Sequence, residues 1–248
     1  MGLSNDSNIE ERNRYMIAGM GVDALRAWVR NWALPERCVL CSTPGTTLCG
    51  PCREDLPGWH AARCPVCAHS SPRAEVCGQC LAHPPRFNRV SVALSYGFPA
   101  DALIRRLKYA SDLALVAPLA RLLFQRVADE ARPDCIVPMP LSRQRLCERG
   151  FNQSLELARV LAAHLELPVA TAVARRIRDT PPQATLPLDR RRANIRGAFE
   201  CDDVDGARVA VVDDVLTSGA TLNELARALL RAGATEVSGW VLARTERA

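Results

Sequence analysis

The stretch that most constrains this chain runs from residue 208 to residue 227. There a short apolar run is followed by two acids, a hydroxyl-rich loop and an amphipathic segment. The run Val209 to Val212 is unbroken and rich in β-branched residues, which is typical of a strand in a parallel sheet covered on both faces. Apolar residues spaced three and four apart from Leu222 onward predict a helix. Because a helix N-terminus offers free backbone N–H groups and a positive dipole end, the pattern predicts a phosphate-binding loop.

Two adjacent acids, Asp213 and Asp214, are expected directly after that strand. Such a pair can accept hydrogen bonds from the two vicinal hydroxyls of a ribose while balancing the charge of a magnesium ion. The loop that follows combines three hydroxyl side chains with a glycine, which lets the backbone approach a ligand closely. Its residues are Thr217, Ser218, Gly219, Ala220 and Thr221. The alternative is an ordinary strand-turn-helix with an acidic turn, which seldom needs both the paired acids and three hydroxyls.

Eight of the eleven cysteines fall in four pairs that share the Cys-x-x-Cys spacing. The pairs are Cys38 and Cys41, Cys49 and Cys52, Cys64 and Cys67, and Cys77 and Cys80. Two such pairs complete one tetrahedral zinc site, so the spacing predicts up to two structural zinc ions with closed coordination spheres. The pairs can combine in sequential or interleaved order, and their short separations favour the sequential order. Redox-active dithiols are the alternative, but they do not usually come four in a row.

The segment over residues 36–84 has too few large apolar side chains to form a core of its own, so a metal is expected to hold it together. Disulfides are less favoured because no export signal precedes the segment. Basic side chains lie in or beside it, namely Arg37, Arg53, Arg63, Arg73 and Arg86. Because Trp59 and Phe87 are the only aromatic side chains there that could stack on bases, binding of single-stranded nucleic acid is a secondary hypothesis for this module.

The composition is that of a soluble protein. The 248 residues carry a net charge of +5, and no apolar run approaches 18 residues. We therefore expect no stable membrane insertion and a cytoplasmic location.

Among the lysines and arginines only Lys108 is a lysine, which makes it a candidate ligand-binding residue where an ammonium is needed. We divide the chain into a disordered leader with a short helix (1–35), a zinc-ribbon module (36–84) and an α/β domain (85–248).

The α/β domain is expected to alternate strands and helices. Strands are predicted over 90–96, 135–140, 209–212 and 237–242, and helices over 101–109, 115–131, 151–167 and from 222 onward. A basic loop over 142–150 holds Arg143, Arg145 and Arg149, which are well placed to meet a pyrophosphate, although a merely solvated loop is the alternative. The arginine-rich stretch over 175–199 has no clear period and is expected to form a closing hood that includes Arg191, with a disordered insert as the alternative.

The order of these motifs resembles that of the ComF (GntX) family of bacterial competence proteins. The matching motifs are the cysteine-rich module, Val-Pro-Met-Pro-Leu (137–141), Arg-Gly-Phe-Asn-Gln-Ser (149–154) and Val-Val-Asp-Asp-Val-Leu-Thr-Ser-Gly-Ala-Thr (211–221). The resemblance implies an α/β fold of the type I phosphoribosyltransferase kind, in which a parallel sheet is flanked by helices and a small hood, after a zinc-ribbon module. It also implies that Asp213 and Asp214 hold the ribose of magnesium-bound phosphoribosyl pyrophosphate and that residues 217–221 hold its 5′-phosphate. A part in handling single-stranded DNA with the uptake machinery during natural transformation is implied as well.

Two classes of function follow. In the first, the chain is a phosphoribosyltransferase whose acceptor the sequence does not identify. In the second, it is a catalytically silent zinc-ribbon adaptor or ligand sensor that keeps the fold without turnover. The arginines serve either class, as ligands of a pyrophosphate or as contacts to a nucleic-acid backbone.

Overall fold

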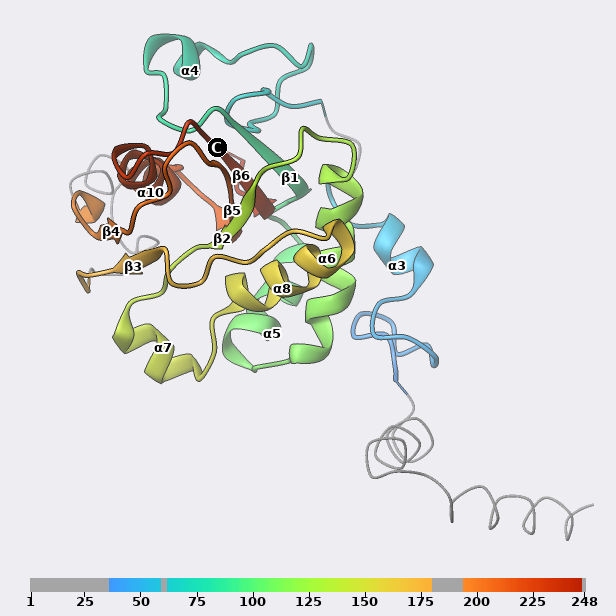
Figure 1. Ribbon diagram of the computed structural model, residues 1–248. Helices are drawn as coiled ribbons and strands as arrows, with labels where there is room; N and C mark the ends of the chain where they lie inside the picture. Colours follow the sequence, from blue (N-terminus) through green and yellow to red (C-terminus); the bar gives the residue numbers. More distant parts are fainter. Residues whose placement is uncertain (1–35, 59–61, 180–193, 247–248) are drawn as a thin grey trace, which may run out of the picture. The chain divides into compact units, whose positions relative to one another are not determined.

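The computed structural model describes residues 36–58, 62–179 and 194–246 (Figure 1). The predicted helix near the N-terminus and Arg191 of the predicted hood lie outside these residues. The chain divides into two compact units, Met1–Cys52 and Arg53–Ala248. This division falls between the two groups of cysteines, whereas the composition changes at residue 84. The second group of cysteines therefore shares a unit with the α/β domain.

A parallel sheet of four strands forms the centre of the larger unit. The strands are β1 (Arg89–Ser95), β2 (Cys135–Pro138), β5 (Arg208–Leu216) and β6 (Glu236–Arg244), and they lie in the order β1-β6-β5-β2. Every neighbouring pair is parallel. The expected parallel sheet is confirmed, and the apolar run that begins at Val209 lies in one of its two central strands. The carboxyl ends of the strands consequently meet at one edge, where ligands of open α/β sheets bind.

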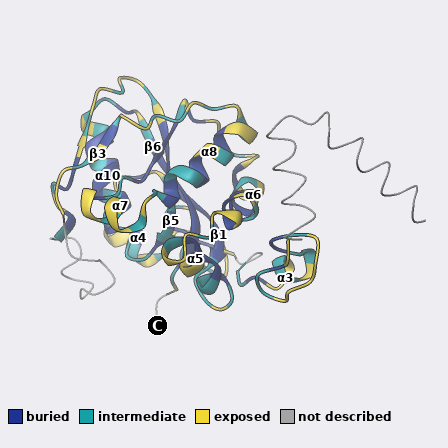
Figure 2. Cartoon of the chain, turned by 90° about the horizontal axis from the view of Figure 1, so that it is seen from below, coloured by how far each residue is buried: buried dark blue, intermediate teal, exposed yellow. Residues whose placement is uncertain are grey.

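Helices cover both faces of this sheet. They are α5 (Ala100–Tyr109), the 3₁₀ turn η1 (Leu113–Leu115), α6 (Val116–Val127), α8 (Gln153–Leu165) and α10 (Ala220–Arg231). Helix α6 packs against α8, β1 and β6, and α8 packs against β5 and β2, whereas α10 covers the opposite face (Figure 1). Leu222 and Leu225 of α10 share one core cluster with Val209 and Val211 of β5. Figure 2 shows the strands as the buried layer between helices with exposed outer surfaces.

A glycine allows α10 to approach the sheet closely. A Cβ atom added to Gly239 of β6 would lie 2.6 Å from Cδ2 of Leu222 and 3.2 Å from Cγ2 of Val90. The first distance is shorter than real Cβ contacts and the second is tighter than most, so a larger residue would force the Leu222 and Val90 side chains to move. Because Leu222 lies in the first turn of α10, the glycine leaves room for the start of this helix beside β6.

The predicted basic loop before α8 is wrong in part, because most of it is the short helix α7 (Arg143–Arg149). The hydroxyl of Ser142 accepts a hydrogen bond from the backbone N–H of Arg145 at the start of this helix. Gly150 ends the helix in a left-handed conformation with φ of 76°. A polar cap and a terminal glycine thus define a helix whose apolar periodicity is too weak to reveal it.

Three further elements differ from the sequence prediction. Strand β5 does not end before the paired acids but continues to Leu216, because its ladder with β6 runs on to that residue. The stretch expected to be irregular begins in β3 (Ala174–Arg176) and ends in β4 (Phe199–Cys201). These two strands form an antiparallel pair. The predicted helix over 115–131 ends earlier, at Val127. Within the residues that the structure describes, no helix has both the length and the apolar character that crossing a membrane requires.

Candidate functional site

The paired acids lie in the last part of β5, and their environments differ. Oδ1 of Asp213 accepts hydrogen bonds from the backbone N–H of Asp214 (2.9 Å) and from the hydroxyl of Ser154 (3.2 Å). Asp214 is buried, with 4% of its surface exposed, and its Oδ2 lies 2.9 Å from Nζ of Lys108 in the last turn of α5. The only lysine of the chain is therefore the counter-ion of one predicted ligand-binding acid.

The carboxylate of Asp213 is difficult to ionise in this setting. Part of the residue reaches the surface, but the carboxylate itself is largely desolvated. This burial, together with the adjacent Asp214, raises the pKa of Asp213 to about 7, and Lys108 and the hydrogen bond from Ser154 only partly oppose the shift. A group with such a pKa binds or releases a proton near neutral pH, which is common at functional sites.

The predicted phosphate loop connects β5 to α10. Gly219 precedes the helix in a left-handed conformation with φ of 76°, which glycine adopts without strain. The hydroxyl of Ser218 accepts a hydrogen bond from the backbone N–H of Ala220 (3.3 Å), the first residue of α10. Thr217 lies in the loop, and Thr221 lies in the first helical turn. The loop thus places hydroxyl and amide donors beside the acids, as an anion-binding helix start requires.

Arginines from α7 and β3 lie close enough to one another to interact electrostatically. Burial and the neighbouring Arg149 lower the pKa of Arg145, and Nη2 of Arg145 has no hydrogen-bond partner among the described residues. Burial and the charge of Arg145 lower the pKa of Arg176, in β3, to about 10, while the charges of Asp179 and Asp213 act in the opposite direction. Mutual repulsion between partly buried cations is relieved by a bound anion, so this group can hold a pyrophosphate.

A tyrosine ring lies next to one of these arginines. Nη1 of Arg149 donates a hydrogen bond to Oε1 of Gln153 (2.9 Å), and its guanidinium carbon lies 5.5 Å from the centre of the Tyr109 ring. Tyr109 is 73% exposed and directly follows Lys108 in the chain. The edge of the site therefore presents an aromatic surface next to positive charge, an arrangement that suits a planar base.

The eight predicted metal ligands form two groups in sequential order. The first group is Cys38, Cys41, Cys49 and Cys52, and the second is Cys64, Cys67, Cys77 and Cys80. Within each group the ligand atoms all lie within 4.8 Å of one another. Short helices begin next to one cysteine pair of each group, namely α3 (Gly50–Glu54) and α4 (Gly78–Ala82). Four convergent thiols without a water position fit a structural zinc ion, and the sequential pairing is confirmed.

The second group is fixed to the α/β domain by polar contacts. The guanidinium of Arg63, next to Cys64, donates hydrogen bonds to Oε1 of Glu246 (2.9 Å), to Oγ of Ser95 (2.6 Å) and to the carbonyl of Ala68 (3.0 Å). Arg63 is buried, with 7% of its surface exposed. Because a buried guanidinium with several partners is costly to move, the second cysteine group and the ends of β1 and β6 hold a fixed geometry within the larger unit.

Comparison with known proteins agrees with this architecture. Residues 29–81 match the model of a double zinc ribbon domain, and residues 151–247 match that of a phosphoribosyl transferase domain. The chain is 33% identical over 211 residues to competence protein F of Haemophilus influenzae, which covers 79% of this chain and 90% of the relative. The chain belongs to the competence protein F family. The expected family and fold class are thereby confirmed.

Two further relatives extend the family relationship. The DNA utilization protein YhgH of Salmonella typhimurium is 35% identical over 224 residues, or 86% of this chain and 98% of the relative. Competence protein ComFC of Bacillus subtilis is 27% identical over 213 residues, or 82% of this chain and 86% of the relative. Each of these matches covers more than four fifths of this chain.

The structure brings together most of the predicted site residues. Lys108 contacts Asp214, and Arg145 and Arg149 lie near each other and near Tyr109, whereas Arg191 lies outside the described residues. The sequence prediction missed the contact between Ser154 and Asp213, because the two residues are far apart in the chain. The start of α8 is capped by Asn152, whose side chain accepts hydrogen bonds from two backbone N–H groups.

Proposed function

We propose that this protein binds magnesium-bound phosphoribosyl pyrophosphate at the carboxyl end of β5. The observation that carries the proposal is the juxtaposition of paired acids, a glycine-led helix start and a cluster of partly buried arginines around one strand end. The names of the relatives refer to competence and DNA utilization. We extend that role to this chain as cytoplasmic handling of single-stranded DNA together with the DNA-uptake machinery.

Each group has a defined task in this proposal. Asp213 and Asp214 accept hydrogen bonds from the ribose hydroxyls, and Lys108 supplies the counter-charge of Asp214. The donors of residues 217–221 hold the 5′-phosphate. Arg145 and Arg149 bind the pyrophosphate together with Arg176, whose contribution the predicted site did not include. Arg191 remains a proposed member of the hood.

The arrangement supports group transfer at the anomeric carbon. When the bond between this carbon and the pyrophosphate oxygen breaks, the electron pair leaves with pyrophosphate and positive charge develops on the ribose. The two acids stabilise that charge, and the arginines stabilise the leaving group. A magnesium ion bound with the ligand would neutralise further charge on the pyrophosphate. Among the described residues we assign none as a general base for an acceptor, so binding without turnover by an adaptor or sensor is the alternative.

Binding is tested by calorimetric titration of the zinc-loaded protein with phosphoribosyl pyrophosphate and magnesium. We expect saturable binding by the wild type and at least a hundredfold weaker binding by Asp213→Asn/Asp214→Asn, because hydrogen bonds to two charged groups are lost. The matched control is Glu54→Gln/Asp55→Asn, which removes an adjacent and exposed pair of acids from the same unit. Equal affinity of both double variants, or no binding by the wild type, would contradict the proposed ligand.

A specific observation also favours binding of single-stranded DNA at the edge of this site. The exposed ring of Tyr109 lies against the guanidinium of Arg149, with Arg145 nearby. Bases of any sequence can stack on an aromatic ring while arginines contact the backbone phosphates. The DNA hypothesis therefore applies to α5 and α7 and does not depend on the zinc ribbons.

We expect Tyr109→Ala to weaken binding of a thymidine oligonucleotide by roughly tenfold, because stacking on one base is lost. Tyr109→Phe should retain the affinity. Arg149→Ala should reduce the slope of affinity against salt concentration by about one, whereas Arg126→Ala, an exposed arginine on α6, should leave it unchanged. Fluorescence anisotropy at several salt concentrations measures both effects. Identical binding by all four variants would rule out this surface.

A further inference from the structure

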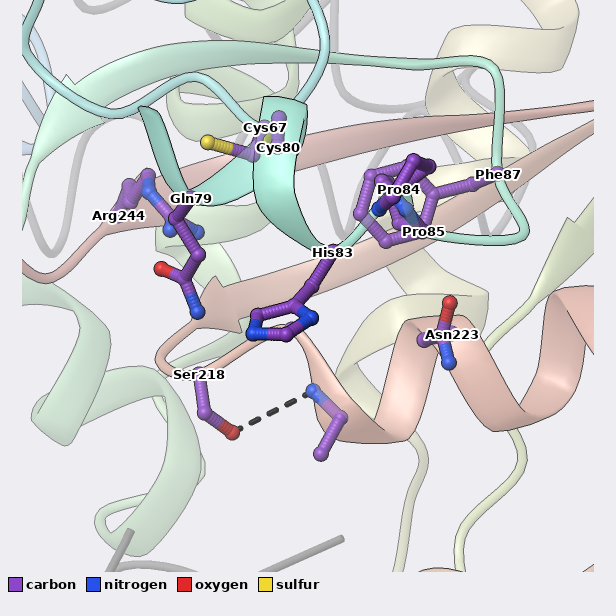
Figure 3. Close-up of a pocket in the computed structure, with 12 residues that line it drawn as sticks. Cys67, Gln79, Cys80, His83, Pro84, Pro85, Phe87, Ser218, Asn223 and Arg244 are labelled. Atoms are coloured by element: carbon purple, nitrogen blue, oxygen red, sulfur yellow. Dashed lines mark hydrogen bonds between the residues drawn. The ribbon is translucent and has the colours of Figure 1, made fainter. Parts of the chain in front are cut away.

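A cavity separates the second cysteine group from the start of α10. It has a volume of about 170 Å³ and lies within the larger unit (Figure 3). One wall comes from α4 and the residues after it, and the other comes from the phosphate loop and the first turn of α10. The residues that line it are Cys67, Gln79, Cys80, His83, Pro84, Pro85, Phe87, Ser218, Gly219, Ala220, Asn223 and Arg244. The cavity thus joins a zinc-ribbon module to the predicted phosphate site.

The side chains around this cavity favour an anionic ligand. None of the lining residues is Asp or Glu. Oδ1 of Asn223 accepts a hydrogen bond from the backbone N–H of Arg86 (2.6 Å), so its amide nitrogen is the end that can serve a ligand. The hydroxyl of Ser218 already accepts a hydrogen bond from Ala220, and its own proton is available to donate. These groups are hydrogen-bond donors of the kind that bind phosphoryl oxygens.

Two side chains of the cysteine-rich module complete the donor set. His83 directly follows α4, and its backbone N–H donates a hydrogen bond to the carbonyl of Gln79 (2.8 Å). In Figure 3 the imidazole of His83 and the carboxamide of Gln79 both point from α4 toward Ser218 and the start of α10. Each can present an N–H group to an oxygen held at the loop.

The geometry that holds α4 opposite the loop is rigid. Cys80, in the middle of α4, and Cys67 belong to the second cysteine group and also line the cavity. The polar contacts of Arg63 join the same module to the ends of β1 and β6. On the loop side, the Phe87 ring is 3.9 Å from the position that a Cβ on Gly219 would occupy, so the ring closes the cavity against the loop.

We propose that this cavity binds the phosphomonoester group of the ligand and that His83 and Gln79 are direct ligand-binding residues. The part of the zinc-ribbon module that carries the second cysteine group then forms a wall of the ligand site and is not only an appended segment. The identity of the ligand as a ribose 5-phosphate derivative rests on the proposed function. The presence of a phosphoryl subsite rests on the cavity and its donors alone.

The test uses ribose 5-phosphate and inorganic pyrophosphate as separate probes on the zinc-loaded full chain. We expect His83→Ala to weaken ribose 5-phosphate about tenfold and Gln79→Ala to have a smaller effect, because each removes a hydrogen bond to a charged group. Pyrophosphate, which the arginines bind, should keep its affinity within about twofold. Leu81→Ala, an exposed position on α4 (69%) that does not line the cavity, is the matched control. His83→Gln should restore part of the affinity by returning a donor.

Zinc content and melting temperature measured on the same samples separate a lost contact from a disturbed module. Unchanged affinity of His83→Ala for ribose 5-phosphate would overturn this inference even if phosphoribosyl pyrophosphate binds as proposed. Selective weakening of ribose 5-phosphate would support the subsite even if the complete ligand does not bind, and the proposed function would then fail alone. Equal weakening of both probes would also overturn the inference, because it would indicate a general structural effect.

Discussion

Replacing Cys80 by serine is expected to reduce the zinc content of the protein from two ions to one per chain. The same substitution should lower the melting temperature of the larger unit by about 10 °C, which corresponds to a loss of roughly 3–5 kcal/mol for a domain of this size. Cys80 is buried, and its Sγ atom lies within 4.8 Å of the Sγ atoms of the other three cysteines of its group. Three thiols leave the metal site incomplete, so binding no longer contributes its full free energy to folding.

The large effect follows from how little else holds this module together. The buried core around the second group consists of the cysteines Cys64, Cys67 and Cys80, against which Val66 and Cys77 pack. Without the metal these thiols are only small apolar groups. Loss of order would also expose the Arg63 contacts with Glu246 and Ser95, which connect the module to the sheet. The damage should therefore reach the α/β domain.

Cys147→Ser is the matched control, because Cys147 is exposed on α7 and belongs to neither metal group. Zinc content is measured by colorimetric release, and the melting temperature by calorimetry. The control should keep two zinc ions and the wild-type melting temperature. A Cys80→Ser protein that behaves like the control would show that the second group is not a structural zinc site.

The sequence was sufficient to predict the central elements because their apolar residues follow recognisable patterns, an unbroken run in β5 and helical spacing in α6 and α10. Val209 to Val212 are all buried, and the apolar positions of α6 and α10 form faces against the sheet. By contrast, α7 has no buried residues, so no periodic signal marks it. The β3–β4 pair joins segments separated by a long stretch of chain, and such pairing leaves little trace in local sequence.

The candidate site could be predicted where its chemistry is contiguous in the chain. The acids and the loop occupy residues 213–221, and the spacing of the cysteines alone indicates metal binding. The contacts of Ser154 with Asp213 and of Lys108 with Asp214 depend on the packing of α8 and α5 against β5. The position of His83 over the cavity depends on how the second module folds onto the sheet. These contacts and the position of His83 join residues that are far apart in the chain, so no local pattern in the sequence predicts them.

The paired acids should also make the unliganded protein less stable than it could be. We expect Asp213→Asn to stabilise the unliganded protein at pH 8 by several kcal/mol, while it weakens binding of the proposed ligand. The pKa of Asp213 is raised from 3.8 to about 7 in the folded protein, so its ionised form carries roughly 4 kcal/mol of unfavourable free energy above pH 7. The Oδ1 of an asparagine can still accept the hydrogen bonds from Ser154 and from the backbone of Asp214.

The pH dependence of this gain distinguishes it from a general packing effect. Between pH 3.8 and about 7 the folded protein binds more protons at Asp213 than the unfolded chain does, so the cost of this residue grows as the pH rises. The advantage of Asp213→Asn should therefore be absent below about pH 4, increase up to about pH 7 and stay constant above it.

Melting curves of both proteins at pH 4 to 9 measure the difference, with Asp55→Asn as an exposed control. An advantage that is independent of pH, or a loss of stability at pH 8, would contradict a desolvated carboxylate at this position. The expected profile would mean that the carboxylate proposed to hold the ribose is retained at a cost to folding, as strained or charged functional sites often are.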